Sequence, residues 1–300
     1  MRSVLRILRA GPLTTIQDNG RFGMLAHGVS ASGPMDREAF WRAGLRAGAS
    51  GDGGLEFTRA GLDIEVAEGQ AVLGWDGGAF GVAVNGVAQD WPGGAWLGAG
   101  DRVSITPGAA GNYGYLRFGA MLDLPMVLGS QSTSTRARLG GLEGRALVAG
   151  DVLGLIGEGR APVLPATPMD EDGPIRFIWG IHAERFSSAV RNRFVGAGFV
   201  VSPTLDRMGV RLLDKGEVFG GESILSLISD PILPGDIQIL GDGTPVVLMV
   251  DHQPTGGYPR IGTIISVDLG RFAQLRPGSP VAFVPVSVDH AQRLLRGCRG

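Results

Sequence analysis

Residues Val82–Gln89, VAVNGVAQ, carry the pattern that decides the fold class. Apolar residues alternate on both sides of Asn85-Gly86. An Asn-Gly pair between alternating runs is the strongest short signal of a β-hairpin, because a type I′ turn requires positive φ at both central residues. We therefore expect two antiparallel strands joined by a tight turn at this point.

A short phrase recurs four times along the chain and predicts further strands. It combines a turn glycine, a small polar residue and an apolar or alternating run: GDRVSI from Gly100, GDVLGL from Gly150, GDIQIL from Gly235 and GSPVAFV from Gly278. Each is typical of a strand that begins after a tight turn. Because the phrase occurs twice in each half of the chain, it favours two related antiparallel barrels or sandwiches.

Helical patterns are few. They cover Pro34–Ala47, Ala183–Val195 and Val288–Arg296. The first begins with proline and has Asp36 and Glu38 in its first turn, as a helix start prefers. The second places three apolar residues four positions apart. So few helices argue against a fold in which strands and helices alternate, and they predict a mainly β protein.

Residues 157–174, GEGRAPVLPATPMDEDGP, separate two halves of the chain. They contain four prolines and an acidic triplet without alternation or a helical period, which is typical of a linker. A chain of 300 residues also exceeds what one hydrophobic core usually serves. We therefore expect an N-terminal β domain over residues 1–160, a proline-rich linker over 161–174 and a C-terminal β domain over 175–300.

Composition excludes several classes of function. The 27 basic and 29 acidic residues give a formal charge of −2, which argues against nucleic acid, since phosphate neutralisation needs clustered cations. Lys215 is the only lysine and stands in LLDKGEV, so no phosphate-binding loop of the GxxxxGK[ST] type is present. The single cysteine, Cys298, fits a reducing compartment. Without an apolar run of membrane-spanning length, we expect a cytoplasmic protein.

Common catalytic motifs are also absent. The chain has no GxSxG, HExxH or CxxC, and no GxGxxG between a strand and a helix. Its histidines, His27, His182, His252 and His290, are scattered, and we predict no metal site. Composition and spacing alone therefore leave the activity open.

Five segments concentrate polar side chains beside glycine. They are TTIQDNGRFG (14–23), SASGPMD (30–36), LGSQSTSTRARLGGLEGR (128–145), LDRMGVRL (205–212) and VDHQPTGGYPR (250–260). Purely structural explanations exist for most: an Asx turn in the first, helix capping in the second, a solvated loop in the third and a long hairpin turn in the last. Arginine forks and exposed amides would equally suit a carboxylate or phosphate.

In this order, these segments resemble the allophanate-hydrolase-subunit-2 family, together with PGDIQILGDGTPVVLMVDHQPTGGYPRIGTIISVDL from Pro234. The resemblance runs from about residue 5 to residue 286. That family includes the third subunit of prokaryotic ATP-dependent 5-oxoprolinase and half of the carboxyltransferase region of biotin-dependent urea carboxylase. The resemblance implies two cyclophilin-like β-barrel domains and an active unit formed with a partner that is similar to allophanate hydrolase subunit 1.

The resemblance also implies the site residues. Catalytic carboxylates would be Asp18, Asp36, Asp206 and Asp251. Substrate-binding residues would be Gln17, Arg21, Ser32, Ser130, Arg136, Arg207, Arg211, Gln238, Gln253, Gly256, Gly257 and Tyr258, with Arg145 as a further motif position. The chain departs from the family at His252, where Arg is more common, and at Pro254, where Thr is more common and where proline removes an N–H donor. We expect the charged positions of both halves to converge on one cleft.

Three functions fit these motifs. The first is the third (C) component of 5-oxoprolinase, hydrolysing 5-oxoproline to glutamate with a B component that is similar to allophanate hydrolase subunit 1 and a lactam-hydrolase-like A component. ATP would bind with or on one of these partners. The second is a carboxyltransferase subunit of a biotin-dependent urea or amide carboxylase, with biotin on another chain. The third is a non-catalytic regulator that binds a kinase-inhibitor-like partner. The motifs are common to all three, so the alternatives stay open, and the first is our leading prediction.

Overall fold

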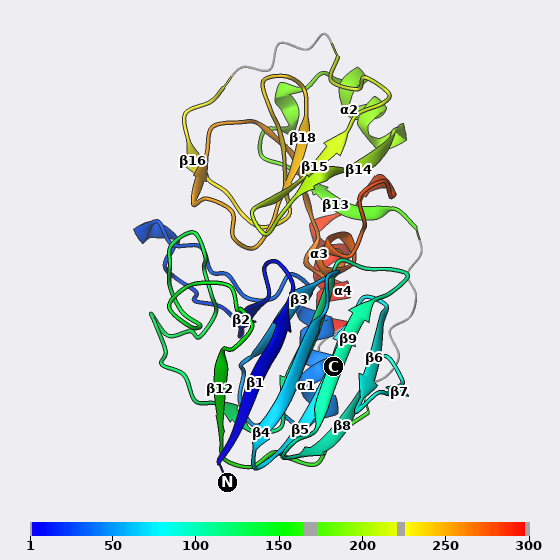
Figure 1. The fold of residues 1–300 in the computed structure, drawn as a ribbon. Coiled ribbons are helices and arrows are strands. Elements are labelled where there is room, and N and C mark those ends of the chain that lie inside the picture. Colours follow the sequence, from blue (N-terminus) through cyan, green and yellow to red (C-terminus); the bar gives the residue numbers. More distant parts are fainter. Residues whose placement is uncertain (1, 165–172, 221–225, 298–300) are drawn as a thin grey trace. The chain divides into compact units, whose positions relative to one another are not determined.

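The computed structural model describes residues 2–164, 173–220 and 226–297. The chain divides into two compact units (Figure 1): unit 1 comprises Met1–Gly23 and Ala31–Pro168, and unit 2 comprises Met24–Ser30 and Met169–Gly300. Residues 165–172 of the predicted linker and Cys298 lie outside the described residues.

Unit 1 consists of two antiparallel sheets. The larger has the strand order β11-β12-β1-β4-β9-β6-β7 and the smaller the order β2-β3-β10-β5-β8. The strands of the larger sheet are β1 (Arg2–Ala10), β4 (Leu62–Glu68), β6 (Phe80–Val84), β7 (Val87–Gln89), β9 (Arg102–Pro107), β11 (Met121–Leu122) and β12 (Val152–Ile156). Those of the smaller are β2 (Thr15–Gln17), β3 (Gly54–Thr58), β5 (Gln70–Gly77), β8 (Gly93–Gly98) and β10 (Tyr113–Phe118).

The predicted hairpin and the four predicted strand starts are confirmed. β6 and β7 pair with Val84 opposite Val87, and both turn residues, Asn85 and Gly86, have positive φ. The recurrent phrases become β9, β12, β17 and β21, each preceded by a glycine at φ between 88° and 96°. A side chain is strained in that region of φ, which explains why a glycine precedes each strand.

One apolar core joins the two sheets of unit 1. β4 alternates buried and half-buried residues, and its Leu62 and Ile64 share a buried cluster with Phe57 and Trp75 of the smaller sheet. Alternation of this kind is what a sheet with one buried face requires.

Helix α1 (Arg37–Ala47) packs on the smaller sheet and confirms the first helix prediction, with Asp36 as its N-cap. Phe40 of α1 meets Tyr115 of β10 edge to face at 5.7 Å. The neighbouring Leu116 lies in the core between the sheets. β10 is therefore buried on both faces, and polar residues that face α1 lie in the interior.

Unit 2 contains a closed barrel in the order β13-β20-β17-β18-β15-β14-β21. Its strands are β13 (Ile175–Trp179), β14 (Gly198–Leu205), β15 (Gly209–Leu213), β17 (Asp236–Ile239), β18 (Pro245–Leu248), β20 (Arg260–Ile264) and β21 (Pro280–Pro285). Only the β13–β21 pair is parallel. A separate ribbon joins β16 (Asp230–Pro231) to β19 (Thr255–Gly256).

Helices α2 (Ser188–Gly196), α3 (Ser266–Ala273) and α4 (Val288–Gly297) complete unit 2, with short 3-10 turns at Leu25–His27 and Ala183–Arg185. The predicted apolar stripe of α2 is confirmed, since Val190 and Phe194 are buried, and Phe194 stacks on Phe283 of β21. The sequence patterns do not predict α3. The prediction of a mainly β protein with few helices is confirmed, and among the described residues no helix has the length and apolar character to span a membrane.

Candidate functional site

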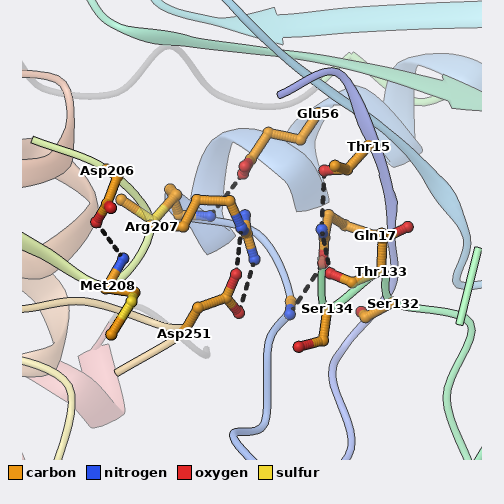
Figure 2. A network of polar contacts seen from close by, with 12 residues as sticks. Thr15, Gln17, Glu56, Ser132, Thr133, Ser134, Asp206, Arg207, Met208 and Asp251 are labelled. Atoms are coloured by element: carbon orange, nitrogen blue, oxygen red, sulfur yellow. Dashed lines mark hydrogen bonds and ion pairs between the residues drawn. The ribbon is translucent and has the colours of Figure 1, made fainter. Parts of the chain in front are cut away.

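Gln17, at the end of β2, is the hub of a buried polar cluster in unit 1 (Figure 2). It is fully buried, and its Nε2 donates to Thr15 Oγ1 at 2.9 Å and to the Thr133 carbonyl at 3.2 Å. Its Oε1 accepts from the Gly33 N–H at 3.0 Å. One side chain therefore ties together three of the sequence segments that belong to the predicted site.

The Asp18 carboxylate accepts four hydrogen bonds. Ser130 and Ser132 hydroxyls and the Gln131 N–H each donate at 2.6 Å, and the Gly20 N–H donates at 2.9 Å. Burial raises the pKa of Asp18, but these donors together outweigh it and leave the pKa below its ordinary value. Asp18 therefore stays ionised with its lone pairs occupied, which suits an anchor for the 130–132 loop better than a proton acceptor.

Arg21 and Ser32 belong to the same cluster. Arg21 is 1% exposed and donates to the Ser132 carbonyl, and its own N–H bonds the Ala31 carbonyl at 2.8 Å. Ser32 has φ 56°, and its buried Oγ has no hydrogen-bond partner in the part of the chain that the structure describes. Gly20 permits the close approach of the two loops, because a Cβ there would lie 2.9 Å from the Ala31 oxygen.

Asp36 and the residue before it are held by two side chains that sequence reasoning missed, those of Tyr115 and Glu56. Its Oδ1 caps α1 through the Ala39 N–H at 3.1 Å, and its own N–H donates to the Tyr115 hydroxyl at 2.7 Å. The preceding N–H, of Met35, donates to Glu56 at 2.7 Å. Burial and the nearby Glu56 and Asp36 carboxylates raise the pKa of Tyr115, so its phenol stays protonated. No motif marks Glu56 or Tyr115, because each is a single polar residue within a strand.

The arginines of the 128–145 segment lie apart from this cluster. Arg136 is exposed, and Arg145 forms a two-pronged pair with Asp151 at 2.7 and 2.8 Å. An open hollow of about 480 Å³ lies beside Arg145, with Arg138 and Glu143 in its lining. Of the two arginines in the lining, Arg145 is already engaged by Asp151.

In unit 2, Arg207 and Asp251 form a buried ion pair (Figure 2). Arg207 Nε lies 2.8 Å and Nη2 3.3 Å from the two carboxylate oxygens, and the Asp251 N–H also donates to the Arg207 carbonyl at 2.8 Å. Asp206, by contrast, is exposed and caps the β14–β15 turn through the N–H groups of Met208 and Gly209. Arg211 is exposed on β15.

His252, next to Asp251, is 2% exposed. Burial lowers its pKa, and the bond to Gln253 and the nearby Asp236 and Asp251 carboxylates oppose this only in part. Its Nδ1 lies 2.6 Å from the Gln253 carbonyl. A neutral ring that donates from Nδ1 has its lone pair on Nε2. His252, which sequence reasoning noted only as a departure, is therefore a candidate proton acceptor.

Gln238 and Arg260 are directly opposite one another on β17 and β20. Arg260 donates to Asp236 at 3.1 Å, to Asp230 at 2.7 Å and to the Pro231 carbonyl at 2.9 Å. Gly256 lies against Gln238, since a Cβ there would be 2.4 Å from Gln238 Nε2. Arg260 is absent from the predicted set of site residues.

The structure thus groups part of the predicted set. Gln17, Asp18, Arg21, Ser32 and Ser130 form one cluster in unit 1. In unit 2, Arg207 pairs with Asp251, and Gln238 lies beside Gly256. Gln253 is half-buried, Gly257 lies beside the Leu227 carbonyl, and Tyr258 is 38% exposed. The convergence of both sets on one cleft stays a prediction. Among the described residues, no three His, Cys, Asp or Glu side chains form a group able to hold a metal ion.

Comparison with known proteins identifies the family. The family model described as carboxyltransferase domain, subdomain A and B, matches residues 27–285. The chain belongs to this family. The resemblance carried by the five polar segments is therefore confirmed.

Two bacterial members of similar length are close in sequence. The C component of the 5-oxoprolinase of Escherichia coli (strain K12) is 35% identical over 293 residues, which cover 96% of this chain and 93% of the relative. The C component of the 5-oxoprolinase of Haemophilus influenzae is 32% identical, over 98% of this chain and 94% of the relative.

A solved structure shares the fold. The crystal structure of the K. lactis urea amidolyase superposes with a TM-score of 0.87 at 27% identity and covers 98% of this chain. This chain spans only 19% of that much longer protein.

Proposed function

We propose that this chain is the C component of an ATP-dependent 5-oxoprolinase and works with partner subunits to hydrolyse 5-oxoproline to glutamate. The observation that carries the proposal is that this chain and its bacterial relatives align over nearly the whole length of both. Relatives named as the C component of 5-oxoprolinase match almost end to end, at 93% and 94% of their length. The urea amidolyase match, by contrast, covers only 19% of that chain.

Hydrolysis of a lactam requires a polarised carbonyl and a water whose proton has an acceptor. Unit 2 offers both kinds of group, because the ion pair of Arg207 with Asp251 brings Arg207 next to the residue before His252. Arg207 stays charged beside Asp251, and neutral His252 follows Asp251 directly in the chain. Within this proposal the Arg207–Asp251 pair orients the substrate, and His252 Nε2 accepts a proton from the attacking water.

ATP would activate the lactam oxygen by transferring its γ-phosphoryl group to it, with ADP as the leaving group, and phosphate would be released once water has opened the ring. The nucleotide would bind mainly on another subunit. The chain lacks a lysine-bearing phosphate loop. Arg145, Arg207 and Arg260 are each engaged by a carboxylate of this chain. With their charges already paired, these residues are poorly suited to the binding of a triphosphate.

The test is reconstitution. Neither this chain alone nor its partners alone, one similar to allophanate hydrolase subunit 1 and one lactam-hydrolase-like, should release glutamate from 5-oxoproline, whereas the complete set should do so with ATP. Turnover by the purified chain alone, or none by the complete set, would contradict the proposal.

The similarity to urea amidolyase supports a second candidate, carboxyl transfer from carboxybiotin to urea or another amide. In that case biotin would be carried by another chain. The same purified subunits, supplied with a biotin carboxylase, its carrier and urea, should then consume bicarbonate in a urea-dependent manner. A reconstituted set that does neither reaction would favour the regulatory alternative.

A further inference from the structure

Two buried N–H donors of unit 2 have no hydrogen-bond partner among the described residues, and they belong to residues that face each other across a strand pair. They are Nε2 of Gln238, which is 2% exposed, and Nε of Arg260, which is 7% exposed. Cross-strand partners project from the same face of a sheet. Buried donors are nearly always satisfied, so two open donors on cross-strand neighbours indicate an acceptor that is shared by them.

The charges around the two donors select the chemistry of that acceptor. Arg260 already binds two carboxylates, Asp236 and Asp230. The group of three is therefore negative by one charge when all are ionised, and it would repel a charged oxygen placed against the two donors. A neutral oxygen with two lone pairs suits the donors better than a carboxylate or a phosphate does.

On one side, Gln238 packs against a glycine backbone, so no side chain covers its amide there. Residues 256 and 257 are both glycine, and a Cβ at 256 would lie 2.4 Å from Gln238 Nε2. Gly256 belongs to β19, which pairs with β16 over only two residue pairs. A ribbon this short has little stability of its own, so a small displacement of β19 would admit a ligand to the donors.

We infer that Gln238 and Arg260 form the binding site for the carbonyl oxygen of a small amide, the lactam carbonyl if the proposed function holds. Both bind the substrate directly. Gln238 Nε2–H and Arg260 Nε–H donate to the same oxygen, while Asp230 and Asp236 fix the guanidinium. This inference rests on the proposed function only for the identity of the amide.

The experiment uses the reconstituted complex with Gln238→Leu and Gln238→Glu. Leucine removes the donor at similar volume, and glutamate replaces it with an acceptor. Losing one hydrogen bond to the substrate should raise KM for 5-oxoproline about tenfold, with kcat changed less. Ile239→Val is the matched control, because Ile239 is a buried neighbour on β17 that carries no donor side chain. Its KM should equal that of the wild type.

A binding measurement separates this inference from the proposed function. Calorimetric titration of the complex with 5-oxoproline, 2-pyrrolidinone and urea should show weaker binding in both Gln238 variants for whichever amide the wild type binds. Equal weakening for 5-oxoproline and 2-pyrrolidinone, which lacks the carboxylate, supports carbonyl recognition. Weakening for 5-oxoproline alone would mean that the site binds the carboxylate, and it would overturn the inference.

Three further outcomes are decisive. Gln238 variants that match Ile239→Val in KM and affinity would show that a structural water alone satisfies the two donors, and the inference fails. Binding of none of the three amides by the wild type also overturns it. A wild-type complex that binds an amide through Gln238 but does not hydrolyse 5-oxoproline would refute the proposed function and leave the site standing.

Discussion

Replacing Arg207 by alanine leaves the carboxylate of Asp251 buried without its cation. The two side chains are 5% and 8% exposed and are joined through two nitrogen–oxygen contacts. Breaking a buried pair by removing one partner destabilises by about 3–5 kcal/mol, because the remaining charge has lost its compensation. At about 4 °C per kcal/mol for a unit of this size, the melting temperature of unit 2 should fall by roughly 12–20 °C.

Differential scanning calorimetry of the full chain measures this shift, with Arg211→Ala as the matched control. Arg211 lies on the adjacent strand β15 but is exposed, so its removal should change stability by about 0.5 kcal/mol or less. Replacing both partners with apolar residues, Arg207→Met with Asp251→Leu, should recover most of the loss, since no buried charge remains. A loss below about 1 kcal/mol for Arg207→Ala would refute the reasoning, because it is the size expected of a solvated pair.

Three further predictions concern single groups. Asp18→Asn should destabilise unit 1 by about 2–3 kcal/mol in urea denaturation, because the amide turns one acceptor into a donor that faces other donors; an unchanged midpoint would contradict the four-donor geometry. Asp36→Ala should lower stability by about 1 kcal/mol through loss of the α1 cap, and Asp36→Ser should restore most of it. The lowered pKa of His252 means that the unfolded chain binds its proton first as the pH falls. Stability should therefore decline below about pH 6.5, and more gently in His252→Gln, whereas equal slopes would show that the folded protein protonates His252 normally.

The β character was predictable because its signals are local. The Asn85-Gly86 turn and the glycines before four strands act through backbone conformation, which neighbouring residues largely determine. α3 was missed for the opposite reason. Its N-cap is Ile265, which offers no side-chain cap, and Gly270 lies inside the helix. Asp268 of α3 instead binds Arg176, 92 residues earlier, and such a contact has no sequence signature.

The candidate site was predictable where polar residues are dense and missed where they are single. The Gln17–Asp18 segment stands out beside its glycines. Glu56 and Tyr115 sit alone within strands, where a polar residue ordinarily faces solvent. Arg260 ends the polar segment 250–260, but nothing in the sequence distinguishes it from a surface arginine at the start of a strand. Glu56 and Tyr115 are fully buried and Arg260 is 7% exposed; in unit 1 a second layer, helix α1, lies over β10. Sequence spacing does not reveal which face of a strand a later segment will cover.

Each of the four predicted catalytic carboxylates already accepts hydrogen bonds. Asp18 accepts four hydrogen bonds, Asp36 caps a helix, and Asp206 caps a turn. An oxygen that already accepts backbone or hydroxyl hydrogens is a weak base, because protonating it would break those bonds. Asp251 likewise accepts from the Arg207 guanidinium with both oxygens. Its chain neighbour His252, whose pKa burial lowers, is the better candidate for a proton acceptor. Under the proposed function, we therefore expect substitution of His252 to lower kcat, and substitution of Asp18 to act mainly through folding.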